Sequence, residues 1–336
     1  MKMTDYEKFQ EMVKSRILDY MPENYQDAAA TILHLRKEND RLQAGLVIKR
    51  AGEKTAMSMD LISYYTRFQS GFTEVTLLKR IAEDYLRGCQ AMSEISITPE
   101  TVLDYGQIKD RIQVQLVSRE MNRERLRDCP HKLIDGTDLA AMFCVKFYDK
   151  EGQEYGSASV TANHLGLWNV TVDQLYETAL KNTMEQMPAV IVSMDGLLDG
   201  TEEPRQPEEV VCEDGRMYIL GNGGDNGGAA VILYPGVLRA LAENSGFNFY
   251  VQPASTREVM LIADNGEVSP KELQYILMLA NRGEIPPQEV LSDQVYYYDG
   301  KEQKISLVTM PEETREILRE INAIQYGSFP EYDQER

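Results

Sequence analysis

Short apolar runs separated by turn signals recur along the whole chain, and this pattern constrains the fold more than any other feature. The clearest runs are ATILHLR, GLVIKR, RIQVQLVSR, LAAMFCVKFYD, FNFYVQPA and EVMLIAD. Their length and composition are typical of β-strands. Most of them are joined by short turns instead of regular helical crossovers, which argues against a doubly wound nucleotide-binding fold. We therefore expect an α+β protein with mostly antiparallel sheets, covering helices and two subdomains.

Helical periodicity and capping signals locate the covering helices. Apolar residues recur at helical spacing over residues 4–21. Thr171 and Gln174 form a capping box at the start of a central helix. Further helices are expected over residues 73–87, 235–244 and 269–280, with Thr98 as another N-cap. Residues 56–68 and 229–234 are expected to be extended, and a hairpin turns at Asp299 and Gly300.

The most polar stretch of the chain lies at residues 195–215 and indicates a domain boundary. It contains eight acidic residues, one arginine and two prolines, which is typical of a solvated linker or excursion. The predicted division is an N-terminal helix and meander subdomain (1–108), a central α+β region (109–194), the acidic stretch (195–215), a C-terminal α+β region (216–325) and a loose tail (326–336).

The chain is strongly acidic, with 35 Lys and Arg residues against 54 Asp and Glu residues. A formal charge of −19 repels the phosphate backbone, so nucleic acid is a disfavoured partner. Charged residues interrupt the apolar positions at the N-terminus, which argues against a signal peptide, and no window has the length and apolarity of a membrane span. These features predict a cytoplasmic protein with no membrane partner.

The stretch YILGNGGDNGGAAVILYPG, residues 218–236, raises the question of a phosphate-binding loop. A Walker loop needs Lys and a hydroxyl residue after its last glycine, but Ala229 and Ala230 follow Gly228. A dinucleotide fingerprint needs a third glycine where Asn226 stands. Gly, Asn and Asp all tolerate positive φ, so we interpret the stretch as a turn. No cofactor is predicted.

Histidine and cysteine do not form a recognisable reaction centre or metal site in the sequence. The three histidines, His34, His131 and His164, lie far apart, so no metal site is predicted. The four cysteines, Cys89, Cys129, Cys144 and Cys212, form no CxxC pair and are expected to be reduced, with Cys144 in the core. Carboxylates are too numerous for any acid–base pair to be singled out.

A stripe of arginines is a candidate binding surface. Arg119, Arg123 and Arg127 would share one face of a helix, which could bind phosphate or an acidic partner. Glu120 and Glu124 stand three residues before Arg123 and Arg127, at a spacing that allows ion pairs. We therefore favour a solvent face carrying ion pairs.

Five residues remain as candidates for a ligand-binding pocket on loops held by strands: Trp168, Tyr234, Ser255, Arg257 and Glu258. Trp168 is the only tryptophan and lies close to His164 in the sequence. A structural role for Trp168 beneath the following helix is the competing interpretation, because aromatic residues are more often structural than catalytic. No catalytic residue is predicted.

The segments HLGLWNVTVDQLYETALKNT, MYILGN and GAAVILYPGVLRALAENSGFNFYVQPASTREVMLIAD, in this order, resemble a family of uncharacterised bacterial proteins. That family is known as a domain of unknown function and is distantly similar to the YtpQ-like family. The resemblance covers residues 1–325 and is most specific from 160 to 264. Where the family usually has Ser-Ser-x-His-Glu, this chain has Ala254 to Glu258 with Arg257 at the histidine position. Arginine stays protonated and cannot replace histidine as a general base, so the resemblance implies a structural motif.

Three functions are compatible with these observations. We favour a non-enzymatic factor that binds an unidentified protein partner, and the family resemblance implies an accessory role linked to mobile elements. The first alternative is an enzyme or small-ligand binder with a pocket near Trp168, Tyr234 and residues 255–258. The second is an acidic mimic of nucleic acid, which would require carboxylates gathered on one face. Oligomeric state does not follow from the sequence.

Overall fold

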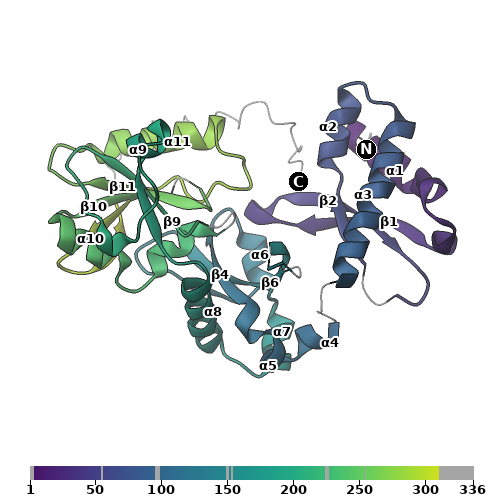
Figure 1. Cartoon of the computed structure of the whole chain (residues 1–336), viewed down its shortest axis with the longest axis horizontal. Coiled ribbons are helices and arrows are strands. Elements are labelled where there is room, and N and C mark those ends of the chain that lie inside the picture. The colour runs from purple at the N-terminus through teal and green to yellow at the C-terminus, as the bar shows by residue number, and fades with distance from the viewer. Residues whose placement is uncertain are drawn as a thin grey trace. The chain divides into compact units, whose positions relative to one another are not determined.

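The chain forms two compact units, each built from helices and antiparallel strands (Figure 1). The computed structural model describes residues 4–53, 56–94, 99–148, 151–152, 154–223, 227–253 and 255–309. The first unit comprises Met1–Asp104 and Lys146–Gly156, and the second comprises Tyr105–Val145 and Ser157–Arg336. The strands form three antiparallel sheets, so the predicted α+β class is confirmed.

The first unit is a three-stranded sheet with helices packed on one face. Its elements are α1 (Asp5–Arg16), β1 (Ala29–Arg36), β2 (Leu42–Lys49), β3 (Ser58–Asp60), α2 (Ile62–Gln69), α3 (Glu74–Glu94) and α4 (Pro99–Leu103). The strand order is β1-β2-β3. Because side chains alternate across a strand, Leu46 and Ile48 both point into the core, where they meet Val13 of α1 and Ile81 and Tyr85 of α3.

The predicted extended segment at residues 56–68 is mostly wrong. Only Ser58–Asp60 is a strand, and α2 begins two residues later. An Asp60 carboxylate oxygen accepts a hydrogen bond from the Ile62 backbone N–H (3.0 Å), which turns the chain into the helix. From there Tyr64, Tyr65 and Phe68 follow helical spacing, and this period overrides the β-propensity of the aromatic residues.

The second unit contains the other two sheets. One has the order β13-β12-β10-β11-β9-β8, and the other has the order β4-β6-β5 with β7 paired to β6. The strands are β4 (Ile112–Ser118), β5 (His131–Leu133), β6 (Leu139–Tyr148), β7 (Glu154–Ser159), β8 (Val190–Ser193), β9 (Met217–Gly221), β10 (Phe249–Gln252), β11 (Glu258–Ala263), β12 (Tyr296–Asp299) and β13 (Lys304–Leu307). The β6–β7 turn is the part that groups with the first unit.

The helices of the second unit begin largely where capping signals predict them. They are α5 (Tyr105–Ile108), α6 (Arg123–Asp128), α7 (Ala162–Trp168), α8 (Val172–Gln186), α9 (Met194–Asp199), α10 (Val237–Ser245) and α11 (Pro270–Gly283). Thr171 and Gln174 form the predicted capping box of α8, and the Ser269 side chain accepts a hydrogen bond at the start of α11. None of the helices in the described part of the chain combines the length and apolarity that a bilayer crossing requires.

The acidic stretch at residues 195–215 packs inside the second unit. Ile191 of β8 and Arg205 exchange two backbone hydrogen bonds (2.8 and 2.9 Å), so the stretch covers the edge of the sheet. Val210 and Cys212 are buried, and the Cys212 N–H donates to the Ser245 hydroxyl at the end of α10 (2.7 Å). Most of the acidic side chains of this stretch are exposed, while Pro207, Val210 and Cys212 are buried.

Residues 229–234 do not form the predicted strand. Gly228–Leu233 forms a 3-10 helix, entered through Gly227 at φ +86°. A short apolar run buried on all sides fits a strand or a helix equally well, so periodicity cannot separate the two. The predicted N-cap Thr98 and the predicted tail at 326–336 lie outside the described residues.

Candidate functional site

Tyr234, a predicted binding residue, closes the C-terminal end of α8. Its buried hydroxyl donates to the carbonyl oxygen of Met187 (2.9 Å), with that of Thr183 at 3.3 Å, and accepts from the Asn222 amide (3.1 Å). The last carbonyls of a helix need external donors, and this hydroxyl supplies one. Burial raises the pKa of Tyr234, so its proton stays in place. Tyr234 acts here as a helix cap.

Trp168 ends α7 and belongs to an aromatic stack. Its ring lies 5.0 Å from the His164 ring at an interplanar angle of 19°, and 5.6 Å from the Tyr105 ring. His164 Nδ1 accepts a hydrogen bond from the Thr161 N–H (3.0 Å), which closes the turn before α7. Burial lowers the pKa of His164, which favours the neutral ring that this bond requires.

The cluster that contains Trp168 and the cluster that contains Tyr234 reach α8 at different points. Tyr105, which packs on Trp168, bonds Thr178 in the middle of the helix (3.2 Å), whereas Tyr234 bonds Met187 just beyond its end. Nine residues of helix separate these points by about 13 Å, because each residue rises about 1.5 Å. The two residues therefore take part in separate clusters.

Ser255, Arg257 and Glu258 form one tight turn before β11. The Ser255 N–H donates to the Glu258 carbonyl (3.2 Å), and the Ser255 hydroxyl accepts from the Arg257 N–H (3.0 Å). The Arg257 guanidinium donates to the Glu289 carboxylate (2.8 Å). A Cβ at Gly228 would lie 1.9 Å from the Arg257 carbonyl oxygen, so the glycine-rich stretch is in backbone contact with this turn. Glycine is needed here for this close approach.

The ionisable groups of the described residues do not assemble a metal site. Within these ranges, no three His, Cys, Asp or Glu side chains lie close enough to hold an ion. Burial raises the pKa of the Cys129 thiol and raises that of Cys212 to about 11, so both remain protonated at neutral pH. On the predicted arginine stripe, Arg123 pairs with Glu120 (3.0 Å) and Arg127 with Glu124 (2.6 Å), which confirms the predicted ion pairs.

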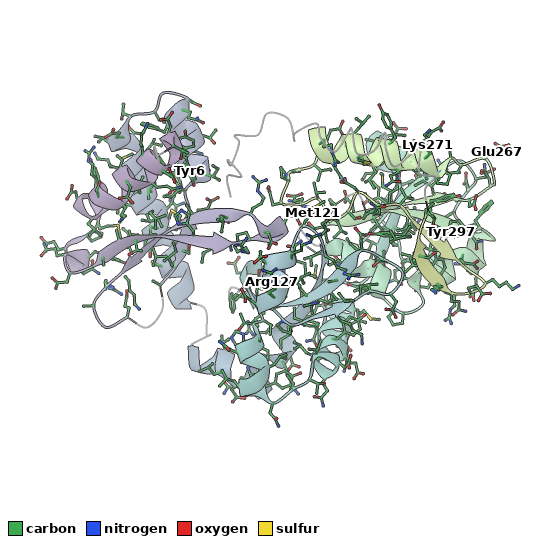
Figure 2. The ribbon with its side chains drawn as sticks, turned by 180° about the vertical axis from the view of Figure 1, so that it is seen from behind. Tyr6, Met121, Arg127, Glu267, Lys271 and Tyr297 are labelled. Carbon is green, nitrogen blue, oxygen red and sulfur yellow. The ribbon has the colours of Figure 1, made fainter. Side chains whose placement is uncertain are left out.

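The outer side of α11 carries a group of exposed apolar side chains. Tyr275, Ile276 and Leu279 are 45%, 56% and 46% exposed. Positions i, i+1 and i+4 fall on one face of a helix, so the three side chains form one apolar strip. Lys271 and Glu267 lie at the N-terminal end of this helix (Figure 2). Single exposed apolar residues are ordinary, but a contiguous strip indicates a contact surface.

The inner side of α11 combines apolar packing by Leu277 and Met278 with buried polar groups. Gln274 and Asn281 are buried, two turns apart. The Asn281 amide donates to the Ser292 carbonyl (3.0 Å) and to the Asp293 carboxylate (2.9 Å). Arg282 forms a two-pronged ion pair with Asp293 (both 2.8 Å). These bonds pair the Asn281 amide nitrogen and join the Arg282 and Asp293 side chains, and they fix which side of the helix faces outward.

The apolar strip on α11 is not among the residues predicted from the sequence, although the sequence contains a signal for it. Residues 275–280 read YILMLA, so apolar residues occupy every side of the helix. A helix that is apolar all round is covered on all sides. Here Leu277 and Met278 cover the sheet, while Tyr275, Ile276 and Leu279 lie uncovered.

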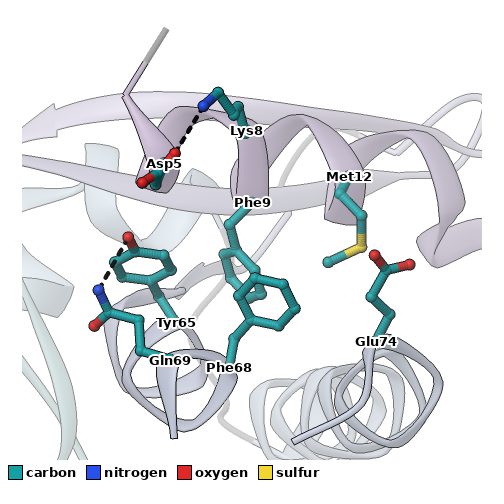
Figure 3. A pocket seen from close by; sticks show the side chains of 8 residues that line it. All are labelled: Asp5, Lys8, Phe9, Met12, Tyr65, Phe68, Gln69 and Glu74. Carbon is teal, nitrogen blue, oxygen red and sulfur yellow. Dashed lines mark hydrogen bonds and ion pairs between the residues drawn. The ribbon is translucent and has the colours of Figure 1, made fainter. Parts of the chain in front are cut away.

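A hollow of about 400 Å³ opens in the first unit between α1, α2 and the start of α3 (Figure 3). Its lining residues are Asp5, Lys8, Phe9, Met12, Tyr65, Phe68, Gln69 and Glu74. The rings of Phe9 and Phe68 are 5.3 Å apart and form an aromatic wall, and Asp5 pairs with Lys8 (2.7 Å). The lining therefore combines aromatic and aliphatic contact with the charged groups of Asp5, Lys8 and Glu74.

Comparisons with known proteins give a family and no function. A family model described as a family of unknown function (DUF5688) matches residues 6–300. No curated protein and no solved structure matches the chain.

Proposed function

The chain belongs to this family of unknown function, and we propose that it is a protein-interaction factor that docks its partner on the outer face of α11. The observation that carries the proposal is the apolar strip of Tyr275, Ile276 and Leu279 on a helix whose inner side is held by polar bonds. The sequence patterns favour the same kind of protein, a cytoplasmic accessory factor, over an enzyme.

Charge favours a cationic partner. Residues 201–309, which include α11, contain 17 acidic and 8 basic residues, whereas residues 1–104 contain 16 and 14. An acidic surface attracts cationic partners and repels acidic ones. An amphipathic helix with basic edges would cover the apolar strip, and the acidic excess of residues 201–309 would attract its basic residues.

The test is capture from an extract of the organism that carries the gene, followed by binding of the purified captured protein. Wild-type chain and an Ile276→Glu variant serve as baits. We expect Ile276→Glu to weaken binding at least about 30-fold, because central apolar anchors contribute about 2 kcal/mol or more. Added salt should weaken binding of the wild type, since part of the attraction is electrostatic.

Leu198→Glu provides the matched control. Leu198 is 78% exposed on α9, so the same chemical change is made on another helix of the same unit. We expect this variant to bind as the wild type does. The proposal is wrong if Ile276→Glu retains the partner, or if both variants lose it equally.

A further inference from the structure

The first unit presents an edge strand, β1, on one side of its sheet. Among the described strands only β2 lies beside β1, which is eight residues long (Figure 1). The face of the sheet that the helices leave open carries apolar side chains. Leu33 is 42% exposed on that face, and Leu35 and Val47 are half-buried there. Long edge strands with apolar residues are ready templates for another strand.

Two observations determine which backbone groups of β1 point outward. In an antiparallel pair, successive residues turn their N–H and C=O groups alternately toward and away from the partner. The Tyr85 hydroxyl bonds both the N–H and the C=O of Ile48 (2.8 and 2.9 Å) on the β3 side, so Ala30, opposite Ile48, turns its own groups away from β2. The Lys37 N–H donates to the Arg41 carbonyl (2.8 Å), so Lys37 turns its N–H toward the β2 side. Counting back along the strand from Lys37 again turns the groups of Arg36, His34, Ile32 and Ala30 away from β2.

The outward-facing backbone groups of β1 therefore belong to alternate residues, namely Ala30, Ile32, His34 and Arg36. By this alternation these groups do not bond β2, and no backbone hydrogen bond outside the helices and sheets of the described residues involves them. Side chains at these positions point to the helix-covered side, while Thr31, Leu33 and Leu35 lie on the open face.

The charge along β1 is polarised. Asp27 precedes the strand, and Arg36 and Lys37 end it. Antiparallel pairing of two copies sets the acidic end of one strand against the basic end of the other. Parallel pairing would set like charges together.

We infer that two copies of this chain join β1 to β1 in antiparallel orientation, with Leu33 on the two-fold axis. In this register all four outward-facing residues pair, Ala30 with Arg36 of the second copy and Ile32 with His34. The two three-stranded sheets become one continuous sheet. The occupant is a second copy because the strand complements itself in both hydrogen bonding and charge.

The same register covers the open apolar face. Leu33 meets Leu33 of the second copy in a non-hydrogen-bonded pair, the closest kind of cross-strand pair, with Cα atoms about 4.5 Å apart. Leu35 faces Thr31 of the second copy. Lys37 faces Ala29 of the second copy, and Asp27 of that copy lies two residues before Ala29, in the turn that leads into β1.

Sedimentation velocity of the full chain, from low micromolar to the highest soluble concentration, tests the dimer. We expect a reversible monomer–dimer equilibrium in the wild type. Leu33→Lys places two like charges on the axis and should give monomer. Leu42→Lys makes the same change at a comparably exposed leucine (50%) on β2 and should leave the dimer unchanged. A wild type that stays monomeric, or a Leu33→Lys variant that still dimerises, overturns the inference.

Two single proline variants test which residues of β1 turn their N–H groups away from β2. His34→Pro removes an outward N–H and should abolish the dimer while leaving the melting temperature nearly unchanged, because edge strands tolerate proline where the N–H faces outward. Leu35→Pro removes an N–H that bonds β2 and should lower the melting temperature markedly. The reverse order would show that the assigned alternation is wrong and refute this interface.

Charge reversal supplies an independent check on orientation. Asp27→Lys and Lys37→Asp should each raise the dimer dissociation constant several-fold, and the double variant should restore it. Failure of the double variant to recover affinity excludes the antiparallel register proposed here, even if a dimer exists.

Discussion

At the scale of single residues, the Tyr234 hydroxyl joins the glycine-rich stretch to α8. Tyr234→Phe removes the acceptor that this hydroxyl offers to the Asn222 amide and the donor that it offers to the Met187 carbonyl. We expect a loss of about 1–3 kcal/mol in the free energy of unfolding, measured by urea denaturation, because buried polar groups that lose a partner are costly. Tyr298 is equally buried and its hydroxyl makes no hydrogen bond in the described part of the chain, so Tyr298→Phe should cost clearly less. Equal losses would contradict the capping role.

Two buried tyrosines, Tyr64 and Tyr85, make the stability of the first unit depend on pH in the alkaline range. Burial raises the pKa of Tyr85 to about 12, and burial with Asp84 raises the pKa of Tyr64 to about 12. The folded state holds these protons more tightly than the unfolded chain, where tyrosine titrates near pH 10. Their contribution to stability is therefore complete below about pH 10 and lost as pH rises toward 12.

We expect the melting temperature to fall between about pH 10 and 12, and Tyr85→Phe to reduce the slope of that fall. The variant should also be less stable at pH 7, since the hydroxyl bonds Ile48 and Met57. Tyr20→Phe, a half-buried tyrosine of the same unit, serves as the control. An unchanged slope in Tyr85→Phe would refute the assignment.

At the scale of elements, we expect substitutions at two adjacent residues of α11 to have very different effects on the free energy of unfolding. Ile276→Glu changes an exposed position and should alter the free energy of unfolding by no more than about 0.5 kcal/mol. Leu277→Ala, next to it on the buried side, should cost about 2–5 kcal/mol through the cavity it leaves. Chemical denaturation of both variants measures the difference. A large loss in Ile276→Glu would mean that the strip is covered within the chain, and the docking proposal would fail with it.

Local signals predicted most elements, and long-range contacts explain the rest. Thr171 and Ser269 fix helix starts because a cap acts on its own first turn. The polar bonds on the inner side of α11 depend on Ser292 and Asp293, which reach the helix only through tertiary folding, so the helix sequence alone could not reveal them. Likewise, Gly228 is identifiable as a glycine position only once the Arg257 carbonyl lies against it.

At the scale of the whole molecule, the two units differ in charge and have separate cores. The first unit has a core built from its own helices and sheet, and its residues 1–104 are nearly neutral. Residues 105–336 contain 38 acidic and 21 basic residues. Self-repulsion of a net charge weakens with ionic strength, so salt should stabilise the second unit more than the first.

The single tryptophan makes this difference measurable. Trp168 is buried in the second unit, so its fluorescence follows that unit alone, whereas far-ultraviolet circular dichroism follows both. We expect the fluorescence transition to move to higher temperature with added salt. Leu46→Ala opens a cavity in the core of the first unit. It should lower the unfolding temperature of the first unit, which dichroism detects, and leave the fluorescence transition of the second unit unchanged. If Leu46→Ala shifts the tryptophan transition by the same amount, the units unfold as one cooperative body, and the α11 surface cannot be treated as belonging to an independently stable module.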